Sequence, residues 1–327
     1  MDLLNLFYEE PQADRWFPLD HYPRKVIRRI VRGRPGPGGQ TRVFLNLCAG
    51  LKQLGIPFRV NDFRHAARNP NEVVGILGKP QVLDKAKWKN PILFGAAIYS
   101  HPSDDPNLLA RLPIRKILVP GEWMRKMCEP AWGETVCVWP VGIDTNRWAP
   151  TKTREKDIDV LLYDKIMWDH EDYERKLINP IVLTLRQKQI RFTTLRYGFY
   201  REEDFRILLA RSRAMIFLCE HETQGIAYQQ ALSCDVPILA WDQGGYWQDP
   251  SYYPHKVKFS PVSSVPYWDH RCGIKFRDFA DFEEKIDRFL AQQMRQELRP
   301  RDFILENLTL EKCAELYVRF YNEAQAA

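Results

Sequence analysis

Short apolar runs alternate with amphipathic segments along the first half of the chain. The run Leu3–Tyr8 is typical of a buried strand, and Thr41–Leu54 places apolar residues at helical spacing until Gly55 ends the pattern. Further strands are predicted at Phe58–Val60, Val73–Ile76, Ile92–Tyr99, Ile117–Val119 and Thr135–Val138. Strands that alternate with helical segments in this way indicate parallel βαβ units.

The second half repeats this pattern after Thr151–Asp157, a polar stretch with the composition of a linker. Its predicted strands are Ile158–Tyr163, Arg191–Leu195, Ala214–Cys219 and Pro237–Trp241. Its predicted helices are Asp172–Gln189, Glu202–Arg211, Gly225–Ser233, Phe279–Leu290 and Leu310–Glu323. We therefore predict an α/β protein with two open parallel sheets in tandem.

The length of 327 residues allows two domains that each bury a core of their own. The predicted domains are residues 1–150 and 151–308, and a C-terminal helix at 309–327 is expected to pack back toward the first domain. Parallel sheets of this kind bind ligands outside the carboxyl ends of their strands. A central cleft between two Rossmann-like domains is therefore the expected site.

The composition is that of a globular protein, with 45% hydrophobic and 28% charged residues. The longest apolar stretch, Pro91–Tyr99, is far shorter than the ~20 residues of a membrane-spanning helix. Met1–Pro11 carries acidic residues and lacks the basic start of a secretory signal peptide. Seven cysteines without a CxxC pair are typical of buried thiols in a reducing compartment, so a cytoplasmic location is expected.

The formal net charge of +6 is too small to predict nucleic-acid binding, but basic residues are concentrated in one segment. Six of the eleven residues from Arg24 to Arg34 are Arg or Lys, and four apolar residues recur among them at helical spacing. The segment is either the solvated face of an ordinary helix or a surface that contacts anionic lipid headgroups or an anionic acceptor. No aromatic residues interleave with these charges, so nucleic acid is not an expected partner.

Several segments resemble known catalytic motifs but lack a residue that the motif requires. The glycines of Gly33–Thr41 have P-loop spacing, but Gly39 stands where the phosphate-binding lysine belongs. His221 and Glu222 begin a zinc-protease motif, but Gly225 occupies the position of its second histidine. The seven histidines lack metal-ligand spacing. We therefore expect neither a bound metal nor an organic cofactor.

The most informative segment begins at the end of the strand predicted at Ala214–Cys219. That strand delivers Glu222 to its carboxyl end, and a helix begins at Gly225. The free N–H groups and partial positive charge of a helix N-terminus suit a diphosphate, contacted here by Thr223, Gln224, Gly225 and Ile226. Glu222 is then placed to accept hydrogen bonds from sugar hydroxyls, as is Gln230 further along the helix. The alternative is that Glu222 is a capping acid and Gln230 a surface amide.

At this point the sequence resembles the retaining, nucleotide-sugar-dependent glycosyltransferases of the GT-B fold, and in particular their large family 4 group. The spacing of Glu222, Gly225, Ala231, Pro237 and Gly244–Gly245 is similar to that of the group's second domain. Three further segments resemble family motifs in the same order, namely Gly38–Gly39, the string Val141–Pro150 and Tyr197–Phe205. The resemblance covers nearly the whole chain.

The resemblance implies a GT-B fold and transfer of a sugar from a nucleoside diphosphate sugar to a glycan, lipid or small-molecule acceptor, with retention of configuration. It implies that Lys165 counters the diphosphate and that Gly38 and Gly39 contact it from the first domain. His101, after the strand predicted at Ile92–Tyr99, corresponds to a histidine at the donor sugar and acceptor. No covalent nucleophile is evident, so same-face attack assisted by the leaving phosphate is implied, without a metal.

Two departures from the family pattern leave alternatives open. Gln230 replaces the second glutamate of the pair, and Lys165 is a single cation where the family has two basic residues. A catalytically silent GT-B module that binds sugar nucleotide or glycan is therefore an alternative, as is a GT-B phosphorylase or epimerase. A group of aromatic residues fits either sugar stacking or ordinary packing, namely Tyr246, Trp247, Tyr252, Tyr253, Tyr267 and Trp268.

Overall fold

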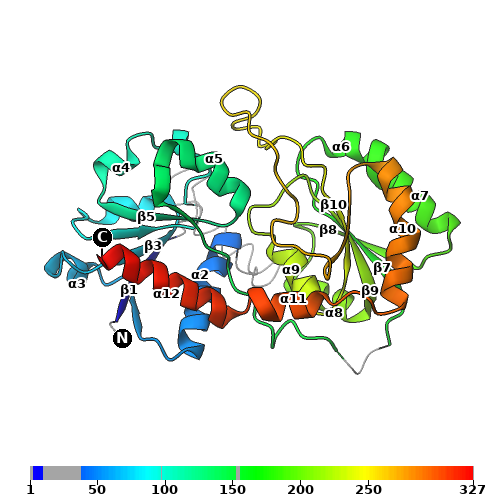
Figure 1. Cartoon of the computed structure of the whole chain (residues 1–327), viewed down its shortest axis with the longest axis horizontal. Coiled ribbons are helices and arrows are strands. Elements are labelled where there is room, and N and C mark those ends of the chain that lie inside the picture. The colour runs from blue at the N-terminus through cyan, green and yellow to red at the C-terminus, as the bar shows by residue number, and fades with distance from the viewer. Residues whose placement is uncertain (1–2, 10–37, 97, 152–154, 327) are drawn as a thin grey trace, which may run out of the picture. The chain divides into compact units, whose positions relative to one another are not determined.

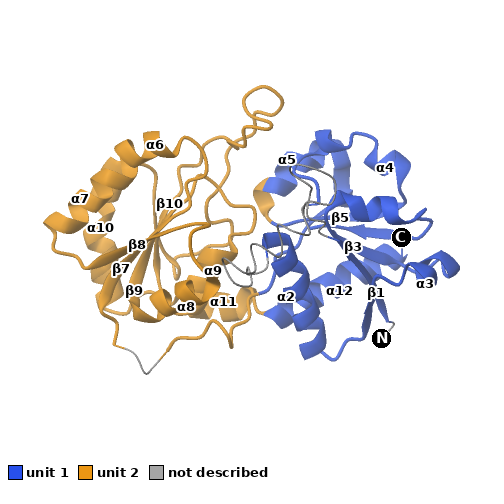
Figure 2. Cartoon of the chain, turned by 180° about the vertical axis from the view of Figure 1, so that it is seen from behind, with its two compact units in different colours: residues 1–120, 124–142, 310–327 blue, residues 121–123, 143–309 orange. Residues whose placement is uncertain are grey.

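The computed structural model of the chain describes residues 3–9, 38–96, 98–151 and 155–326 (Figure 1). Contacts divide it into two compact units (Figure 2). Unit 1 contains residues 1–120, 124–142 and 310–327, and unit 2 contains residues 121–123 and 143–309. The division between the units therefore falls at Gly142 rather than at Pro150, and the C-terminal helix is part of unit 1. The basic segment Arg24–Arg34 lies outside the described residues.

Unit 1 is built on a six-stranded parallel sheet, as the sequence predicts. The strand order is β2-β1-β3-β4-β5-β6. The strands are β1 (Leu4–Glu9), β2 (Phe58–Val60), β3 (Val74–Gly78), β4 (Ile92–Phe94), β5 (Ile114–Val119) and β6 (Val136–Val138). The predicted strand Ile92–Tyr99 ends early, because Gly95 has a φ of 127°, which lies outside the extended range. A Cβ at Gly95 would lie 2.3 Å from the carbonyl oxygen of Leu118, so the position requires glycine.

The helices of unit 1 bury their apolar stripes on this sheet. They are α2 (Gly39–Gln53), α3 (Phe63–Arg68), α4 (Leu108–Arg111), α5 (Glu122–Trp132, of which residues 124–132 belong to unit 1) and α12 (Leu310–Ala326), with 3₁₀ turns at Pro80–Lys85, Pro102–Asp104 and Gly133–Thr135. Helices α2 and α12 share one core with β1. Gly50 permits their close approach, since a Cβ there would lie 2.3 Å from the carbonyl oxygen of Leu310. The Nε1 of Trp139 donates to the carbonyl of Cys313 at 2.8 Å and ties α12 to the sheet.

Unit 2 is built on a five-stranded parallel sheet in the order β11-β10-β9-β7-β8. The strands are β7 (Ile158–Asp164), β8 (Phe192–Arg196), β9 (Ser212–Leu218), β10 (Ile238–Trp241) and β11 (Gly273–Phe276). The chain passes from β7 to β8 on one side and then returns to β9 on the other side of β7. This reversal creates a topological switch point, where sheets of this kind bind ligands beyond the carboxyl ends of the strands.

Helices cover both faces of the unit 2 sheet (Figure 1). They are α6 (His170–Tyr173), α7 (Asn179–Gln187), α8 (Glu202–Arg211), α9 (Ile226–Ser233), α10 (Phe279–Met294) and α11 (Pro300–Asn307), and a π-helical stretch, Glu174–Ile178, joins α6 to α7. Side chains of α7 and α10 share a core with β7 and β9. On the other face, Tyr163 packs on Phe205 of α8 and Phe217 packs on Tyr228 of α9. Both faces of the strands are therefore buried, which explains their continuous apolar sequences.

All seven cysteines are free thiols in the structure, and five of them are buried. Burial raises the pKa of the buried thiols, for example that of Cys128 to about 12. Within the described residues, no helix has both the length and the apolar character needed to cross a bilayer.

Candidate functional site

Lys165 and Glu222 meet at the switch point of the unit 2 sheet. Lys165 directly follows β7, and its backbone N–H donates to the carbonyl of Leu218 at the end of β9 at 2.8 Å. The Nζ of Lys165 donates to Oε1 of Glu222 in an ion pair whose side chains are 17% and 9% exposed. Burial opposes the charged ammonium, but the nearby Glu222 carboxylate outweighs it and raises the pKa of Lys165 above its usual value.

An aromatic ring completes the surroundings of this ammonium. The Nζ of Lys165 lies 4.6 Å from the ring centroid of Tyr197, which follows β8. Next to it, the hydroxyls of Tyr163 and Tyr200 are hydrogen-bonded to each other. The ammonium is held by a carboxylate and by a ring face, which also attracts cations. The site therefore has a fixed positive group that remains partly open to solvent.

The backbone around Glu222 is fixed from two directions. The indole Nε1 of Trp123, a residue of unit 2, donates to the carbonyl of Glu222 at 2.8 Å. The backbone N–H of Glu222 donates to the carbonyl of Ser263 at 2.9 Å. The position of the carboxylate is therefore set by the backbone as well as by Lys165.

Helix α9 begins directly after this segment, as the sequence predicts. Gly225 precedes its first residue in a left-handed conformation with a φ of 79°, and a Cβ there would lie 2.0 Å from the ring of Tyr228. Gly225 has no side chain, so the N-cap position itself supplies no oxygen to the first N–H groups of the helix. An uncapped helix N-terminus beside a lysine has the features of an anion-binding site.

Three glutamines surround the start of α9. The side chain of Gln224 donates to Gln229 at 3.0 Å, and the amide of Gln229 donates back to the carbonyl of Gln224 at 2.8 Å. Gln229 is fully buried, and the sequence analysis did not single it out. Gln230 is 8% exposed, so the alternative that it is a surface amide is wrong. Its role toward a nucleoside stays a prediction.

Glu220 and His221 precede Glu222, and the sequence analysis assigned neither a role in binding. Oε1 of Glu220 accepts hydrogen bonds from the backbone N–H groups of Met167 and Trp168 at 2.8 and 2.9 Å. Burial raises the pKa of Glu220. Glu220 therefore positions the loop that follows Lys165. An acid directly after an apolar strand is the sequence feature that could have pointed to this role.

The ring of His221 lies beside two indoles. Its centroid is 5.1 Å from that of Trp168 and 5.9 Å from that of Trp123. Burial lowers the pKa of His221 to about 4, against the attraction of Asp249 and helped by the positive charge of Lys165. The imidazole is therefore neutral at physiological pH and acts as part of an aromatic packing group.

A second charged cluster joins the carboxyl ends of β7 and β8. Asp164 is buried, and its Oδ2 contacts Nε2 of His170 at 2.7 Å and the guanidinium of Arg196 at 3.1 Å. Asp164 and Arg196 are register partners in the sheet. Arg196 and Lys165 are thus each paired with a carboxylate, and Lys165 is the one whose partner, Glu222, lies four residues before the first residue of α9.

Three of the predicted site residues belong to unit 1. Gly38 is the extended residue before α2, and Gly39 is the first residue of that helix. His101 precedes a short 3₁₀ turn, where its Nδ1 accepts a hydrogen bond from the N–H of Ser103 at 3.1 Å. Burial lowers the pKa of His101. The other predicted residues, Lys165, Glu222–Ile226 and Gln230, lie together in unit 2, and all of these assignments stay predictions.

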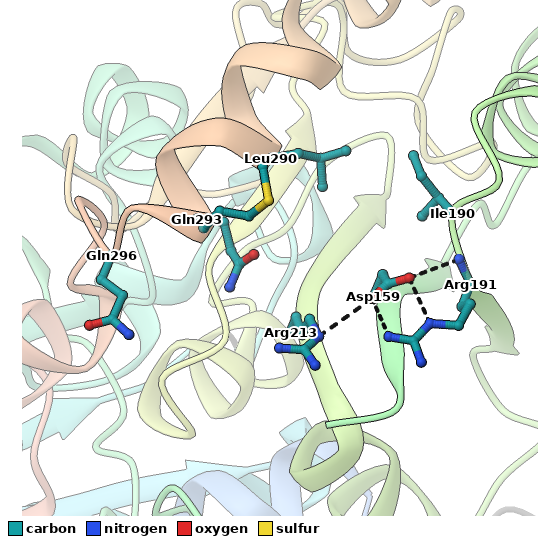
Figure 3. A pocket seen from close by; sticks show the side chains of 8 residues that line it. Asp159, Ile190, Arg191, Arg213, Leu290, Gln293 and Gln296 are labelled. Carbon is teal, nitrogen blue, oxygen red and sulfur yellow. Dashed lines mark hydrogen bonds and ion pairs between the residues drawn. The ribbon is translucent and has the colours of Figure 1, made fainter. Parts of the chain in front are cut away.

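A pocket of about 500 Å³ lies at the opposite edge of the unit 2 sheet (Figure 3). It is lined at the amino ends of the strands by Asp159, Arg191 and Arg213, and by the end of α10. Arg191 is paired there with Asp159 through two nitrogens, at 2.8 and 3.0 Å. Because ligands of doubly wound sheets bind at the carboxyl edge, we do not assign this pocket to the candidate site.

Metal ligands do not gather at any one place among the described residues. No group of three or more His, Cys, Asp or Glu side chains is arranged there to hold a metal ion. The positive groups beside Glu222 are instead an ammonium and a helix N-terminus.

Two parallel-sheet units in one chain, each with helices on both faces, define the GT-B fold. No family model matches the chain, and no curated protein matches it in sequence. Solved structures do match it. One is AviGT4, a glycosyltransferase involved in avilamycin A biosynthesis, with a TM-score of 0.60 and 14% identity over 100% of this chain and 99% of the other.

Two further structures show the same architecture. Sucrose-phosphate synthase (tll1590) from Thermosynechococcus elongatus has a TM-score of 0.54 and 10% identity, over 99% of this chain and 100% of the other. TarM from S. aureus has a TM-score of 0.54 and 14% identity, over 86% of this chain and 59% of the other. At such low identity these likenesses establish the GT-B fold, and the fold expectation is confirmed.

Proposed function

We propose that this protein is a glycosyltransferase that moves a sugar from a nucleoside diphosphate sugar to a glycan, lipid or small-molecule acceptor. The observation that carries the proposal is the Lys165–Glu222 pair beside the uncapped N-terminus of α9 at the switch point of unit 2. A cation, a helix N-terminus whose N-cap glycine supplies no capping side chain and a hydroxyl acceptor then lie at one edge of one sheet. These are the groups that a sugar joined to a diphosphate needs.

The diphosphate would lie on the N–H groups around Thr223–Ile226, with Lys165 as its counter-charge. Because Lys165 is paired with Glu222 in the free protein, an incoming phosphate shares or replaces that carboxylate. Glu222 is then available to accept hydrogen bonds from hydroxyls of the transferred sugar. Gln230 would contact the nucleoside through its amide, where a carboxylate would give a stronger, charge-assisted hydrogen bond.

The chemical step would depend on stabilising the leaving diphosphate. Negative charge develops on its oxygens as the bond to the sugar breaks, and fixed N–H groups and an ammonium stabilise that charge. We propose that the acceptor attacks from the same face, assisted by the leaving phosphate, so that configuration is retained without a metal. Gly38, Gly39 and His101 are proposed to act from unit 1, the glycines at the diphosphate and His101 at the sugar.

The similar structures support the choice of donor class. TarM is described in complex with UDP and α-GlcNAc-glycerol, and the pneumococcal O-GlcNAc transferase GtfA in complex with UDP and GlcNAc. UDP-linked sugars are therefore the first donors to test.

We also propose a cytoplasmic location, with peripheral contact to anionic membrane through Arg24–Arg34.

One observation favours a second candidate, a GT-B module that binds sugar nucleotide without turnover. Gln230 stands where an acid is expected from the family pattern. In the protein without ligand, the charge of Lys165 is already neutralised by Glu222. Binding of nucleoside diphosphate without release of sugar to any acceptor would favour this module over the enzyme.

The experiment incubates the protein with a panel of nucleoside diphosphate sugars and measures release of the nucleoside diphosphate, with and without candidate acceptors. We expect Glu222→Gln to lower turnover while affinity for the free nucleoside diphosphate stays at least equal, because the substitution releases Lys165. We expect Gln230→Ala to weaken nucleotide and donor binding alike, with less effect on turnover. Equal damage to free nucleotide binding by both variants would contradict this placement of sugar and nucleoside.

A further inference from the structure

The loop between β10 and β11 is the longest irregular segment of unit 2. Residues 242–272 contain neither helix nor strand, although loops beyond about 12–15 residues without regular structure are uncommon and usually functional. The loop leaves the carboxyl end of β10, the same edge of the sheet that carries Lys165 and Glu222. Figure 1 shows part of it, in yellow and gold, extending beyond the rest of the unit.

The base of this β10–β11 loop is firmly fixed. The hydroxyl of Ser264 donates to the carbonyl of Trp241 at 2.7 Å, and the backbone N–H of Val262 donates to the carbonyl of Gly245 at 3.1 Å. The carbonyl of Ser263 accepts the backbone N–H of Glu222. The loop is therefore a closed excursion from residue 246 to residue 261, attached directly to the segment that carries the proposed sugar-binding carboxylate.

Two stacked aromatic pairs fill the excursion. Trp247 stacks on Tyr252 with ring centroids 4.5 Å apart and an interplanar angle of 28°, and it is only 4% exposed. Tyr246 stacks on Tyr253 at 5.4 Å and 30°, but Tyr246 is 45% exposed. The inner pair, Trp247–Tyr252, thus contains the packed tryptophan, and the outer pair, Tyr246–Tyr253, contains the exposed Tyr246, while Tyr252 and Tyr253 are both half-buried. The structure thus distinguishes a packed aromatic residue, Trp247, from an exposed one, Tyr246, which the sequence alone does not.

The exposed side chains of the excursion limit the kinds of molecule that could bind to it. Apart from Tyr246, its exposed residues are Pro250, Ser251, Pro254, His255, Lys256, Lys258, Ser260 and Pro261. Insertion into a bilayer requires exposed Leu, Phe or Trp side chains, and the excursion displays none. A stable protein interface buries roughly 800 Å² per partner with several apolar anchors, far more than one tyrosine pair supplies.

A sugar ring fits these features. One face of a pyranose presents C–H groups over an area close to that of one aromatic ring, and its rim carries hydroxyls. Tyrosine offers an apolar face and a hydroxyl, and serine, histidine and lysine side chains around it can hydrogen-bond hydroxyls. We propose that the Tyr246–Tyr253 pair is a stacking platform for a pyranose ring of a carbohydrate acceptor, so that the acceptor class is a glycan. This inference rests on the proposed transferase function.

The test uses an array of immobilised oligosaccharides probed with the full-length protein and with Tyr246→Ala, Tyr246→Trp and Leu183→Ala. Leu183 lies on α7, and its side chain is 55% exposed, so its variant is the matched control for loss of an exposed apolar group. We expect the wild-type protein and the Leu183 and Trp variants to bind the same glycans. Tyr246→Ala is expected to bind them about tenfold more weakly, the scale of one lost aromatic contact.

A parallel titration with UDP, ADP and GDP separates this inference from the proposed function. We expect Tyr246→Ala to bind the nucleoside diphosphate as the wild type does, which also shows that the variant is folded. If the wild type binds no oligosaccharide on the array, or if Tyr246→Ala binds them unchanged, the platform is wrong while the donor site stands. If the wild type binds glycans through Tyr246 but no nucleoside diphosphate, the transferase function is wrong instead.

Discussion

The ammonium of Lys165 and the carboxylate of Glu222 form a largely buried ion pair that joins the carboxyl ends of β7 and β9. The sequence predicts both residues as ligands of one donor, but it does not predict that they bind each other. In the proposed function, Lys165 binds a phosphate and Glu222 binds sugar hydroxyls. In the free protein, the two side chains bind each other instead. Under the proposed function, donor binding is therefore an exchange of ionic partners rather than the filling of an uncharged space.

Loss of one partner of this pair should destabilise the fold more than loss of both. Lys165→Met leaves the Glu222 carboxylate buried without a counter-charge, and we expect a loss of about 2–3 kcal/mol in the free energy of unfolding. The double variant Lys165→Met, Glu222→Gln removes both charges and should recover at least half of that loss. Chemical denaturation of the single and double variants measures this coupling, and strictly additive losses would show that the two charges do not interact.

The turn at Gly225 should tolerate no side chain. Gly225→Ala combines a left-handed backbone with a Cβ driven into the ring of Tyr228, so we expect a loss of more than about 2 kcal/mol. Gly244→Ala is the matched control, because Gly244 has a φ of 66° but nothing within 4 Å of its Cβ position, and it should cost about 1 kcal/mol. The urea concentrations at the unfolding midpoint of the two variants test this prediction. Equal midpoints would mean that the Tyr228 contact is absent in solution.

His221 should make stability depend on pH on the acidic side. Its pKa in the folded protein is about 4 and near 6.5 when unfolded, so the unfolded chain binds more protons between these values. Stability from this residue is therefore full above pH 6.5 and falls as the pH drops toward 4, by up to about 3 kcal/mol.

The substitution His221→Phe keeps the packing on Trp168 and Trp123 and removes the titration. Thermal unfolding between pH 7 and pH 4 should then fall less steeply for this variant than for the wild type. His255→Phe, at an exposed position, serves as the control and should follow the wild-type curve. Parallel curves for the wild type and His221→Phe would refute the buried, neutral imidazole.

Arg301 should be a structural residue that fixes residues 143–150 within unit 2. Its guanidinium donates to the carbonyls of Thr145 and Trp148 at 3.1 Å each and also to that of Ser233. Arg301→Met leaves these partly buried carbonyls without a donor, and we expect a loss of about 2–3 kcal/mol. Arg295→Met removes an exposed pair with Glu297 and should change stability by less than about 0.5 kcal/mol. Matching denaturation curves for the two variants would count against this role.

The sequence predicts most of the strands because they are buried on both faces. The apolar residues Val160–Tyr163 and Ala214–Leu218 are continuous runs, as fully covered parallel strands require. Strand β11 was not predicted, since Gly273–Phe276 is a short edge strand with a lysine and only one buried residue. The strand predicted at Ile92–Tyr99 was too long, because an apolar composition does not reveal the backbone turn at Gly95.

The candidate site was predictable only in part. Glu222, Gly225 and α9 are close in sequence, so their spacing carries the information that places them together. The contact of Lys165 with Glu222 spans 57 positions and depends on the order of the strands, which no local pattern encodes. The clamp of Glu220 on the following loop and the separation of inner from outer aromatic pairs likewise depend on tertiary packing. These features need the structure.

Titration of nucleoside diphosphate into the wild type, Lys165→Ala and Lys188→Ala tests the central claim most directly. We predict that UDP, ADP or GDP binds the wild type, and that Lys165→Ala weakens this binding by about 2–3 kcal/mol, roughly 30–150-fold. Lys188→Ala, which removes an exposed pair with Asp287, should bind as the wild type does. If none of the three nucleotides binds, or if Lys165→Ala binds as tightly as the wild type, the carboxyl edge of unit 2 is not the donor site.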